Sequence, residues 1–179
     1  MSVTYDEAKL KELILYVAER LLADPRGGAT KINKILFASE WSHMREHGRP
    51  ITGAEYQKLP KGPAPRALLP VREALLADGD AELVEEPIGG NSLDRLKPLR
   101  RADLRRVTDE ERRHVDRAIE ELWGQTADEV SDLSHREMGW QMVDEGDTIP
   151  FVSALLATNV TVTDAMRQRA GELARLLNR

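Results

Sequence analysis

The sequence predicts a mainly α-helical fold, a compact helical domain with a short β-hairpin and α+β at most. Hydrophobic residues make up 41% of the 179 residues but aromatic residues only 4%, so the core must be built mostly from Leu, Ile, Val and Ala. Such a core suits helix packing better than a β-sandwich. Because the length is near that of one domain and no repeat or change of composition divides the chain, we expect a single domain over residues 1–179.

The first predicted element is an amphipathic helix near the N-terminus. Thr4 and Glu7 have the spacing of a capping box, and the helix should stop near Ala23, before Pro25. Its apolar face is formed by Leu10, Leu13, Ile14, Val17 and Leu21. We therefore expect this helix to contribute one stripe of the core.

A second helix should follow, capped by Thr30 and running to about His47. After it, residues 48–70 contain too many glycines and prolines for a long regular element. Ile51, Tyr56 and Leu59 give this segment apolar anchors, which a disordered linker lacks. We therefore predict an ordered loop that packs on the core and is not a domain boundary.

A third helical stripe, over residues 68–76, ends at Gly79, and a β-hairpin should come next. Its strands are predicted at residues 81–86 and 95–101, because the Gly-Gly-Asn sequence between them suits a hairpin turn. Pro98 cannot donate a backbone hydrogen bond, so the second strand should be an edge strand or be interrupted there.

Two further capping boxes predict two further helices. Thr108 with Glu111 opens the first, which should end at Gly124, and Thr126 with Glu129 opens the second, which should end near Gly139. A last amphipathic helix is predicted from about Thr163, within the C-terminal residues 157–179.

The tryptophans at the ends of these helices have two possible roles, in the core or as interface anchors. Trp123 follows the buried position Ile119 in the pattern, and we expect it in the core. Trp140 should lie just past a helix end and pack beneath the glycine- and proline-rich loop.

Several functional classes find no support in the sequence. The absence of cysteine removes disulfides and thiol chemistry and agrees with a cytoplasmic location. The N-terminus lacks the pattern of a signal peptide, and no apolar run approaches the roughly 20 residues that span a bilayer. Neither a dinucleotide-binding nor a P-loop motif occurs, so we expect no cofactor and no enzymatic activity.

Two groups of side chains could suggest catalysis or metal binding, but each is weak. His43 and His47 are four residues apart on a predicted helix with Glu40 or Glu46 near by, yet the sequence identifies no third ligand from a distant segment, so it assigns no metal site. Ser131 and Ser134 lie near His135 without the sharp turn that exposes a serine nucleophile. We expect His135 to be a partly buried hydrogen-bonding residue, with a direct role in binding as the alternative.

The charges are segregated along the chain, whose net charge is −5. Residues 94–117 hold nine Lys or Arg against six Asp or Glu, whereas residues 116–147 hold ten acidic residues against two basic ones. The plain interpretation is two solvated helix faces, and the sharper one is an acidic surface that recruits a basic partner. The basic segment 95–113 also leaves open a helix-turn-helix regulator of its own operon, although no clear recognition helix follows a tight turn.

Three stretches of the chain resemble the SocA-like Panacea-domain antitoxin family, which includes phage-associated proteins. Residues 31–38 (KINKILFA) are similar to the family's Lys-Leu-x-Lys-Leu-Leu-aromatic-aromatic-Ala helix, and residues 48–63 are similar to its central loop ending in Gly-Pro. Residues 133–140 (LSHREMGW) are similar to its Ser/Thr-His helix followed by a tryptophan. The resemblance covers roughly residues 28–156.

The resemblance implies an antitoxin that neutralises a partner toxin by direct protein contact, in some members as an adaptor that delivers the toxin to a protease. We expect the toxin to dock near the loop from Gly48 to Arg66 and the adjoining helix ends. The candidate partner-binding residues are Tyr56, Lys58, Lys61, Arg66, His135 and Trp140. For Tyr56 and Trp140 the alternative is a mostly buried, structural role.

Overall fold

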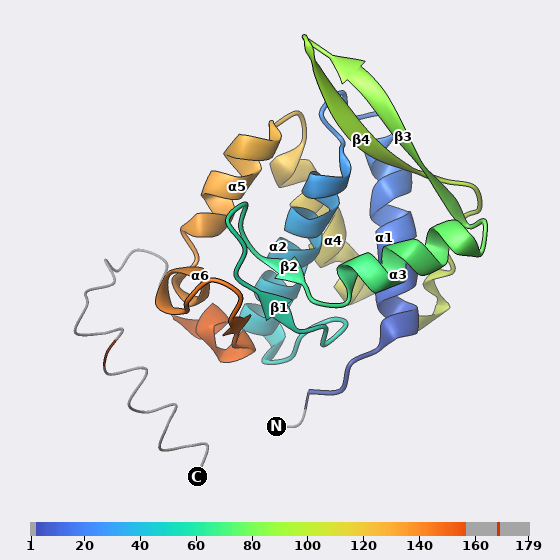
Figure 1. Cartoon of the computed structure of the whole chain (residues 1–179). Helices are drawn as coiled ribbons and strands as arrows, with labels where there is room; N and C mark the ends of the chain where they lie inside the picture. The colour runs from blue at the N-terminus through green and yellow to red at the C-terminus, as the bar shows by residue number, and fades with distance from the viewer. Residues whose placement is uncertain (1–2, 157–167, 169–179) are drawn as a thin grey trace.

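The helix α2 (Ala29–His47) runs through the middle of the protein, and the other elements are arranged around it (Figure 1). The structure is a computed structural model that describes residues 3–156 and 168. The other elements are α1 (Glu7–Leu21), β1 (Tyr56–Gln57), β2 (Ala64–Pro65), α3 (Leu68–Ala77), β3 (Ala81–Ile88), β4 (Asn91–Pro98), η1 (Leu104–Arg106), α4 (Asp109–Leu122), α5 (Ala127–His135), α6 (Met138–Met142), β5 (Thr148–Ile149) and η2 (Phe151–Leu155). The predicted fold class, mainly α with a short hairpin, is confirmed, and the predicted C-terminal helix lies outside the described residues.

The core is formed where α1, α4 and α5 pack on α2. The apolar face predicted for α1 is buried along its whole length. On α2, apolar residues including Ile35 and Trp41 are fully buried. Trp41 packs on Phe37, with 4.1 Å between ring centroids, and on Tyr56 at 5.4 Å. An aromatic cluster therefore joins α2 to the loop that follows it.

Of the four helix N-caps predicted from the sequence, two are confirmed and two are wrong. The capping boxes of Thr108 and Thr126 are both present, each closed by a glutamate three residues on. The first two predicted caps are wrong. Asp6, not Thr4, caps α1, because a backbone hydrogen bond from Asp6 N to Thr52 O holds the preceding segment outside the helix. Gly28, not Thr30, stands at the N-cap of α2, where a Cβ would collide with the side chain of Leu93.

The predicted hairpin is confirmed, but both strands extend closer to the turn than expected and the second ends at Pro98 instead of residue 101. Strands β3 and β4 pair without interruption from Ala81 opposite Pro98 to Ile88 opposite Asn91. Gly89 and Gly90 make the connection with φ of 53° and 88°, a conformation that favours glycine at both positions. Pro98 lies at the end of the ladder of a two-stranded sheet, as its missing N–H requires.

The glycine- and proline-rich loop after α2 is ordered, as predicted. Its strands β1 and β2 pair with each other, and β1 also pairs with β5, so that Tyr56 lies opposite Ile149. This small antiparallel sheet attaches the loop to a segment more than ninety residues later in the chain. The loop and the C-terminal part of the described chain therefore form one surface.

Two predictions about tryptophan are wrong. Trp123 is 43% exposed; it is the C-cap of α4, where its ψ of 135° ends the helix directly after the buried Leu122. Trp140 lies inside α6, not just past a helix end. The short helix α6 lies close against η2 because Gly139 has no side chain. A Cβ at this position would lie 2.0 Å from Ser153 Oγ. Within residues 3–156, none of the helices has the length and apolar character needed to cross a membrane.

Candidate functional site

The three sequence stretches that carry the family resemblance meet at one place in the structure. Lys34, from α2, donates a hydrogen bond from Nζ to the carbonyl oxygen of Pro63 at 3.1 Å. Next to it, Gly62 has a φ of 93°, and a Cβ at this position would lie 2.3 Å from Ser134 Oγ and 2.6 Å from Lys34 Nζ. Only glycine fits where the loop passes between α2 and α5, so the Gly-Pro pair fixes the contact between these elements.

Lys34 is an unusual residue in this contact, because its side chain is buried. The residue is 3% exposed, and among the described residues it forms no ion pair. Burial lowers the pKa of Lys34 to about 8, since a charged ammonium is poorly solvated there. The hydrogen bond to Pro63 O offsets part of the free-energy cost of burying the charged ammonium. The site therefore holds, below the loop, an amine that is cationic but readily deprotonated.

A second cluster adjoins the first and contains three of the predicted residues. The rings of His135 and Trp140 are stacked, with centroids 3.9 Å apart and an angle of 15°. Lys58 places Nζ 4.2 Å from the centroid of the Trp140 ring and donates a hydrogen bond to Val143 O at 2.9 Å. Trp140 Nε1 donates to Leu59 O at 3.4 Å, so the prediction that Trp140 packs beneath the loop is confirmed.

His135 is half-buried and holds α5 against α6 by stacking. Its carbonyl accepts a hydrogen bond from Gln141 Nε2, while its own Nε2 is buried without a hydrogen-bond partner among the described residues. Burial lowers the pKa of His135, and the positive charges of Lys34 and Lys58 lower it further. His135 is therefore neutral near pH 7, and its contact with Trp140 is a stack of two neutral rings and not a cation–π contact.

Comparison with known protein families matches the family described as "Antitoxin SocA-like, Panacea domain" over residues 32–141. This range covers more than half of the chain and, apart from Lys31, contains all three stretches that meet at Gly62. The chain belongs to this family. Searches of curated proteins and of solved structures gave no match.

The remaining predicted residues of the Panacea domain have different environments. Tyr56 is 0% exposed and packs between Trp41 and Phe37, so it is a core residue and cannot be a surface anchor in this conformation. Lys61 is exposed on the loop. Arg66 is exposed as well, but it donates to Gly146 O at 2.6 Å and thereby fastens the loop to the turn before β5.

The serines beside His135 have their hydroxyl groups engaged with backbone. Ser134 Oγ donates to Ser131 O at 2.7 Å, and Ser131 Oγ donates to Ala127 O at 2.7 Å. These are bonds to the preceding helical turn, which point each hydroxyl along its own helix and not toward His135. The geometry of this cluster fits support of the helix more closely than activation of a nucleophile.

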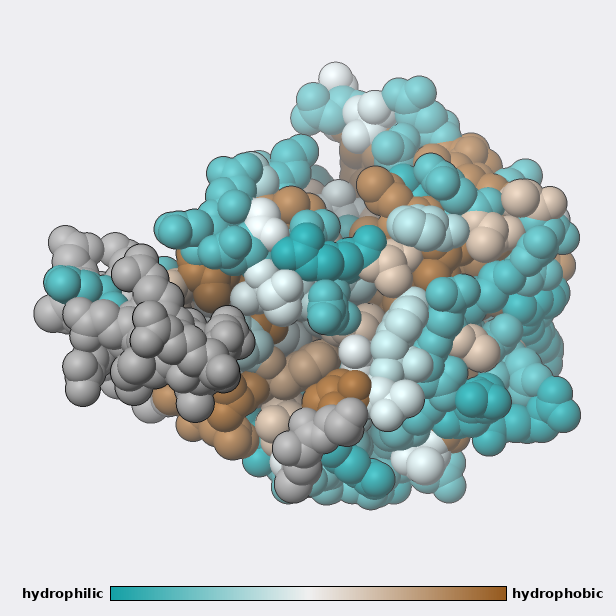
Figure 2. Space-filling view, turned by 60° about the horizontal axis from the view of Figure 1, so that its bottom comes forward, coloured by the Kyte–Doolittle hydropathy of each residue, from teal (hydrophilic) through white to brown (hydrophobic). Residues whose placement is uncertain are grey.

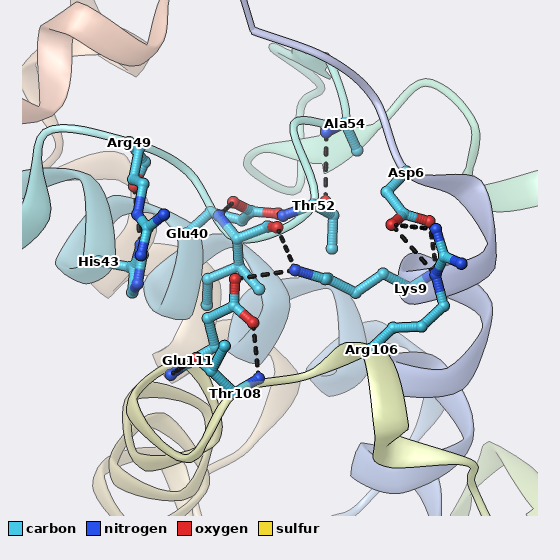
Figure 3. A network of polar contacts seen from close by, with 11 residues as sticks. Asp6, Lys9, Glu40, His43, Arg49, Thr52, Ala54, Arg106, Thr108 and Glu111 are labelled. Atoms are coloured by element: carbon cyan, nitrogen blue, oxygen red, sulfur yellow. Dashed lines mark hydrogen bonds and ion pairs between the residues drawn. The ribbon is translucent and has the colours of Figure 1, made fainter.

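The first half of the loop, residues 48–54, is held by a buried carboxylate of the central helix (Figure 3). Glu40 accepts hydrogen bonds from Ile51 N at 2.5 Å, from Thr52 N at 2.9 Å and from Thr52 Oγ1. Lys9 adds a hydrogen bond from Nζ to Ile51 O at 3.3 Å. Burial outweighs these bonds and raises the pKa of Glu40 to about 7. This carboxylate therefore positions the loop backbone from inside the Panacea domain.

The loop fixed in this way forms one wall of an apolar groove of about 790 Å³, and η2 forms the other. The apolar residues lining it include Val3, Met44, Ile51, Phe151, Val152 and Leu155. Val152 and Leu155 are 63% and 56% exposed, which is unusual for large apolar side chains that lie together. Figure 2 brings this side of the molecule forward and shows apolar surface there.

The structure changes the interpretation of the basic segment 95–113. Most of the basic side chains of residues 95–113 are engaged in ion pairs within the protein; the pairs are Arg95–Glu86, Lys97–Glu86, Arg100–Glu12, Arg105–Asp103, Arg106–Asp6 and Arg112–Asp109. This segment is therefore less available to a phosphate backbone than its composition suggests.

The His43 and His47 pair also gains neighbours that the sequence did not identify. His114, from α4, lies with its ring centroid 5.1 Å from that of His43 and 5.3 Å from that of His47. A residue 67 positions away from His47 shows no sequence periodicity that would reveal this contact. Together these residues form a histidine cluster (His43, His47 and His114) between α2 and α4.

Proposed function

We propose that this Panacea-domain protein is an antitoxin that neutralises a cognate protein toxin by direct binding, without catalysis, in the cytoplasm. The observation that carries the proposal is the family match over residues 32–141, which includes the contact of Lys34, Gly62 and Ser134. The binding mechanism agrees with the exposed apolar groove, because such a groove is typical of a surface that a partner covers. The absence of cysteine agrees with the proposed compartment.

The toxin docks, in this proposal, in the apolar groove between residues 48–53 and η2. This position refines the surface expected from the sequence, since the groove uses the first half of the loop together with an adjoining helix end. The loop face around Lys61 and Trp140 would then lie at the rim of the contact. A stable interface of about 1,600 Å² needs such a rim around a few buried anchors.

An acidic segment precedes β5 and η2 in the chain and favours a basic partner, whereas Arg49, which lines the groove, is itself basic. Asp144, Glu145 and Asp147 are exposed and directly precede β5 and η2 in the chain. In this proposal the acidic segment pairs with Lys or Arg of the toxin outside the groove, and the groove receives the toxin's apolar residues. This arrangement is the sharper of the two interpretations that the charge pattern left open.

Co-expression with the products of neighbouring genes tests the proposal. The toxic partner should lose its toxicity when this protein is present, and the two proteins should co-purify. A protein that rescues cells from none of its neighbours, or that turns over a small molecule in isolation, would contradict the proposed function.

A matched pair of substitutions tests the groove as the docking surface. Leu155→Asp introduces a charge into the groove, and Leu69→Asp introduces the same charge on α3 at nearly equal exposure, 54% against 56%. We expect rescue and co-purification to be lost only with Leu155→Asp. Equal rescue by both variants would mean that the toxin binds elsewhere. Lys61→Glu would then test the loop face by itself, because Lys61 makes fewer internal contacts than Arg66.

Sequestration and delivery to a protease differ in the fate of the toxin. If the protein only covers the toxin, the amount of toxin in the cell should stay constant while toxicity disappears. If it acts as an adaptor, the half-life of the toxin should shorten when the antitoxin is co-expressed. Measuring toxin levels after translation is stopped separates the two.

A further inference from the structure

The hydrogen bonds of the histidine cluster are compatible with tautomers in which Nε2 carries no proton on any of the three rings. His43 Nδ1 lies 2.7 Å from Arg49 O, and a carbonyl can only accept, so Nδ1 carries the proton (Figure 3). His47 Nδ1 lies 2.6 Å from Glu110 Oε1, again an acceptor. In both rings Nε2 is therefore available as an acceptor.

His114 follows the same pattern through a serine. Its Nδ1 lies 2.8 Å from Ser42 Oγ, and that hydroxyl already donates its proton to Ser39 O at 3.1 Å. Ser42 Oγ can then accept from His114 Nδ1, and in this tautomer Nε2 of His114 keeps its lone pair. A metal-binding histidine typically has this arrangement, with one ring nitrogen hydrogen-bonded to a fixed acceptor and the other free to coordinate.

The free nitrogens face one another at distances that suit a shared cation. His47 Nε2 and His114 Nε2 are 3.3 Å apart, with no proton left between them in these tautomers. Glu46 supplies a third group, a carboxylate whose Oε2 lies 3.6 Å from His114 Nε2 and whose Oε1 lies 3.8 Å from His47 Nε2. Ligand atoms held about 2.0–2.1 Å from a tetrahedral zinc ion are roughly 3.3 Å from each other, so only small movements of Glu46 are needed.

His43 completes the surroundings of the cluster. It is 0% exposed, and its Nε2 is buried without a hydrogen-bond partner among the described residues. Its ring centroid lies 4.6 Å from that of His47, with which it stands in the i, i+4 relation on α2.

We propose that His47, His114 and Glu46, with His43 beside them, form a binding site for a divalent transition-metal ion of the zinc type. Imidazole and carboxylate are ligands that such an ion prefers, and the hydrogen bonds from Arg49, Ser42 and Glu110 orient the rings. The bound ion would connect the C-terminal turn of α2 to α4. It would thus stabilise the helix pair at the start of the loop that follows α2.

Zinc binding by the full-length protein tests the site. After treatment with a chelator and its removal, we expect the protein to bind one equivalent of added Zn²⁺ and to gain thermal stability, and Co²⁺ to give the visible absorption of a tetrahedral nitrogen-ligated centre. Absence of saturable Zn²⁺ binding would overturn the proposal.

Variants of partly exposed residues avoid loss of folding. His47→Gln and Glu46→Gln change side chains that are 24% and 56% exposed, whereas His114 is buried. We expect His47→Gln to weaken Zn²⁺ binding by roughly 100-fold or more, and Ser42→Ala, which removes the acceptor of His114, to weaken it by about 10- to 100-fold. His135→Gln, at the one histidine outside the cluster, is the matched control and should bind as the wild type does. Equal affinity of the His47→Gln variant and the wild type would overturn the site.

Discussion

The Cβ atom that Gly62 lacks would lie 2.6 Å from Nζ of Lys34. These two residues, from the loop and from the central helix, are thus in contact because one has no side chain and the other has a long one. The contact brings Pro63 O within hydrogen-bond distance of the buried ammonium. The close fit between Gly62 and the long Lys34 side chain, together with the hydrogen bond, holds the loop against the helix.

Gly62→Ala should destabilise the protein by about 2–4 kcal/mol, because it combines a left-handed backbone with a steric collision. Gly90→Ala is the control, since Gly90 has a similar φ, 88° against 93°, and nothing lies within 4 Å of its missing Cβ. We expect only about 1 kcal/mol of destabilisation from that variant. Urea denaturation of both variants measures the difference, and equal losses would show that Gly62 is needed for its backbone conformation alone.

Lys34→Met should change the dependence of stability on pH. The folded-state pKa of about 8 lies below the ordinary value of 10.5, so the unfolded chain binds more protons between these values, and stability rises with pH across this window. The methionine variant lacks this gain, which is about 3 kcal/mol at most. Free energies of unfolding measured at pH 7.5 and pH 10 should therefore diverge, the wild type gaining relative to the variant. Parallel curves would mean that the amine is solvated.

Glu40→Gln should change the pH dependence of stability in the opposite direction. The folded-state pKa of about 7 lies above the ordinary value of 4.5, so the folded protein binds more protons between them, and this group's contribution to stability is lost as pH rises from about 4.5 to 7. The variant should be less stable by about 1–3 kcal/mol at low pH, because its amide cannot accept every hydrogen bond from Ile51 and Thr52. Its stability should also vary less with pH over this range. A wild type with no loss between pH 5 and pH 7 would contradict the assignment.

Arg95→Met should cost about 2–4 kcal/mol, since it leaves several backbone carbonyls after α1 without their donor. Arg95 is 6% exposed and donates to Leu21 O at 2.7 Å, to Asp24 O at 3.2 Å and to Gly27 O at 3.1 Å. Arg105→Met is the matched control, because the Arg105 side chain is 88% exposed and pairs only locally with Asp103. Thermal unfolding should separate the two variants by several degrees, and similar midpoints would show that Arg95 is not needed to hold the hairpin against α1.

The sequence by itself determined the features that depend on neighbours along the chain. The buried stripe of α1, the capping boxes of Thr108 and Thr126, and the turn at Gly89 and Gly90 all follow from spacings of a few residues. The family resemblance was also visible in the sequence, because it depends on the order of short stretches. In these places local propensity and the final fold agree.

Only the tertiary structure decided which side chains share a surface. Tyr56 is in the core although it seemed a candidate anchor, and Trp123 is exposed although its helical position indicated the core. His114 and His47, which are 67 positions apart in the chain, meet between two helices. Such contacts arise because several elements pack around the central helix. A contact between two distant segments produces no periodic pattern in the sequence of either one. The groove has the same origin, because its walls come from a loop and from η2, which the small β-sheet brings together.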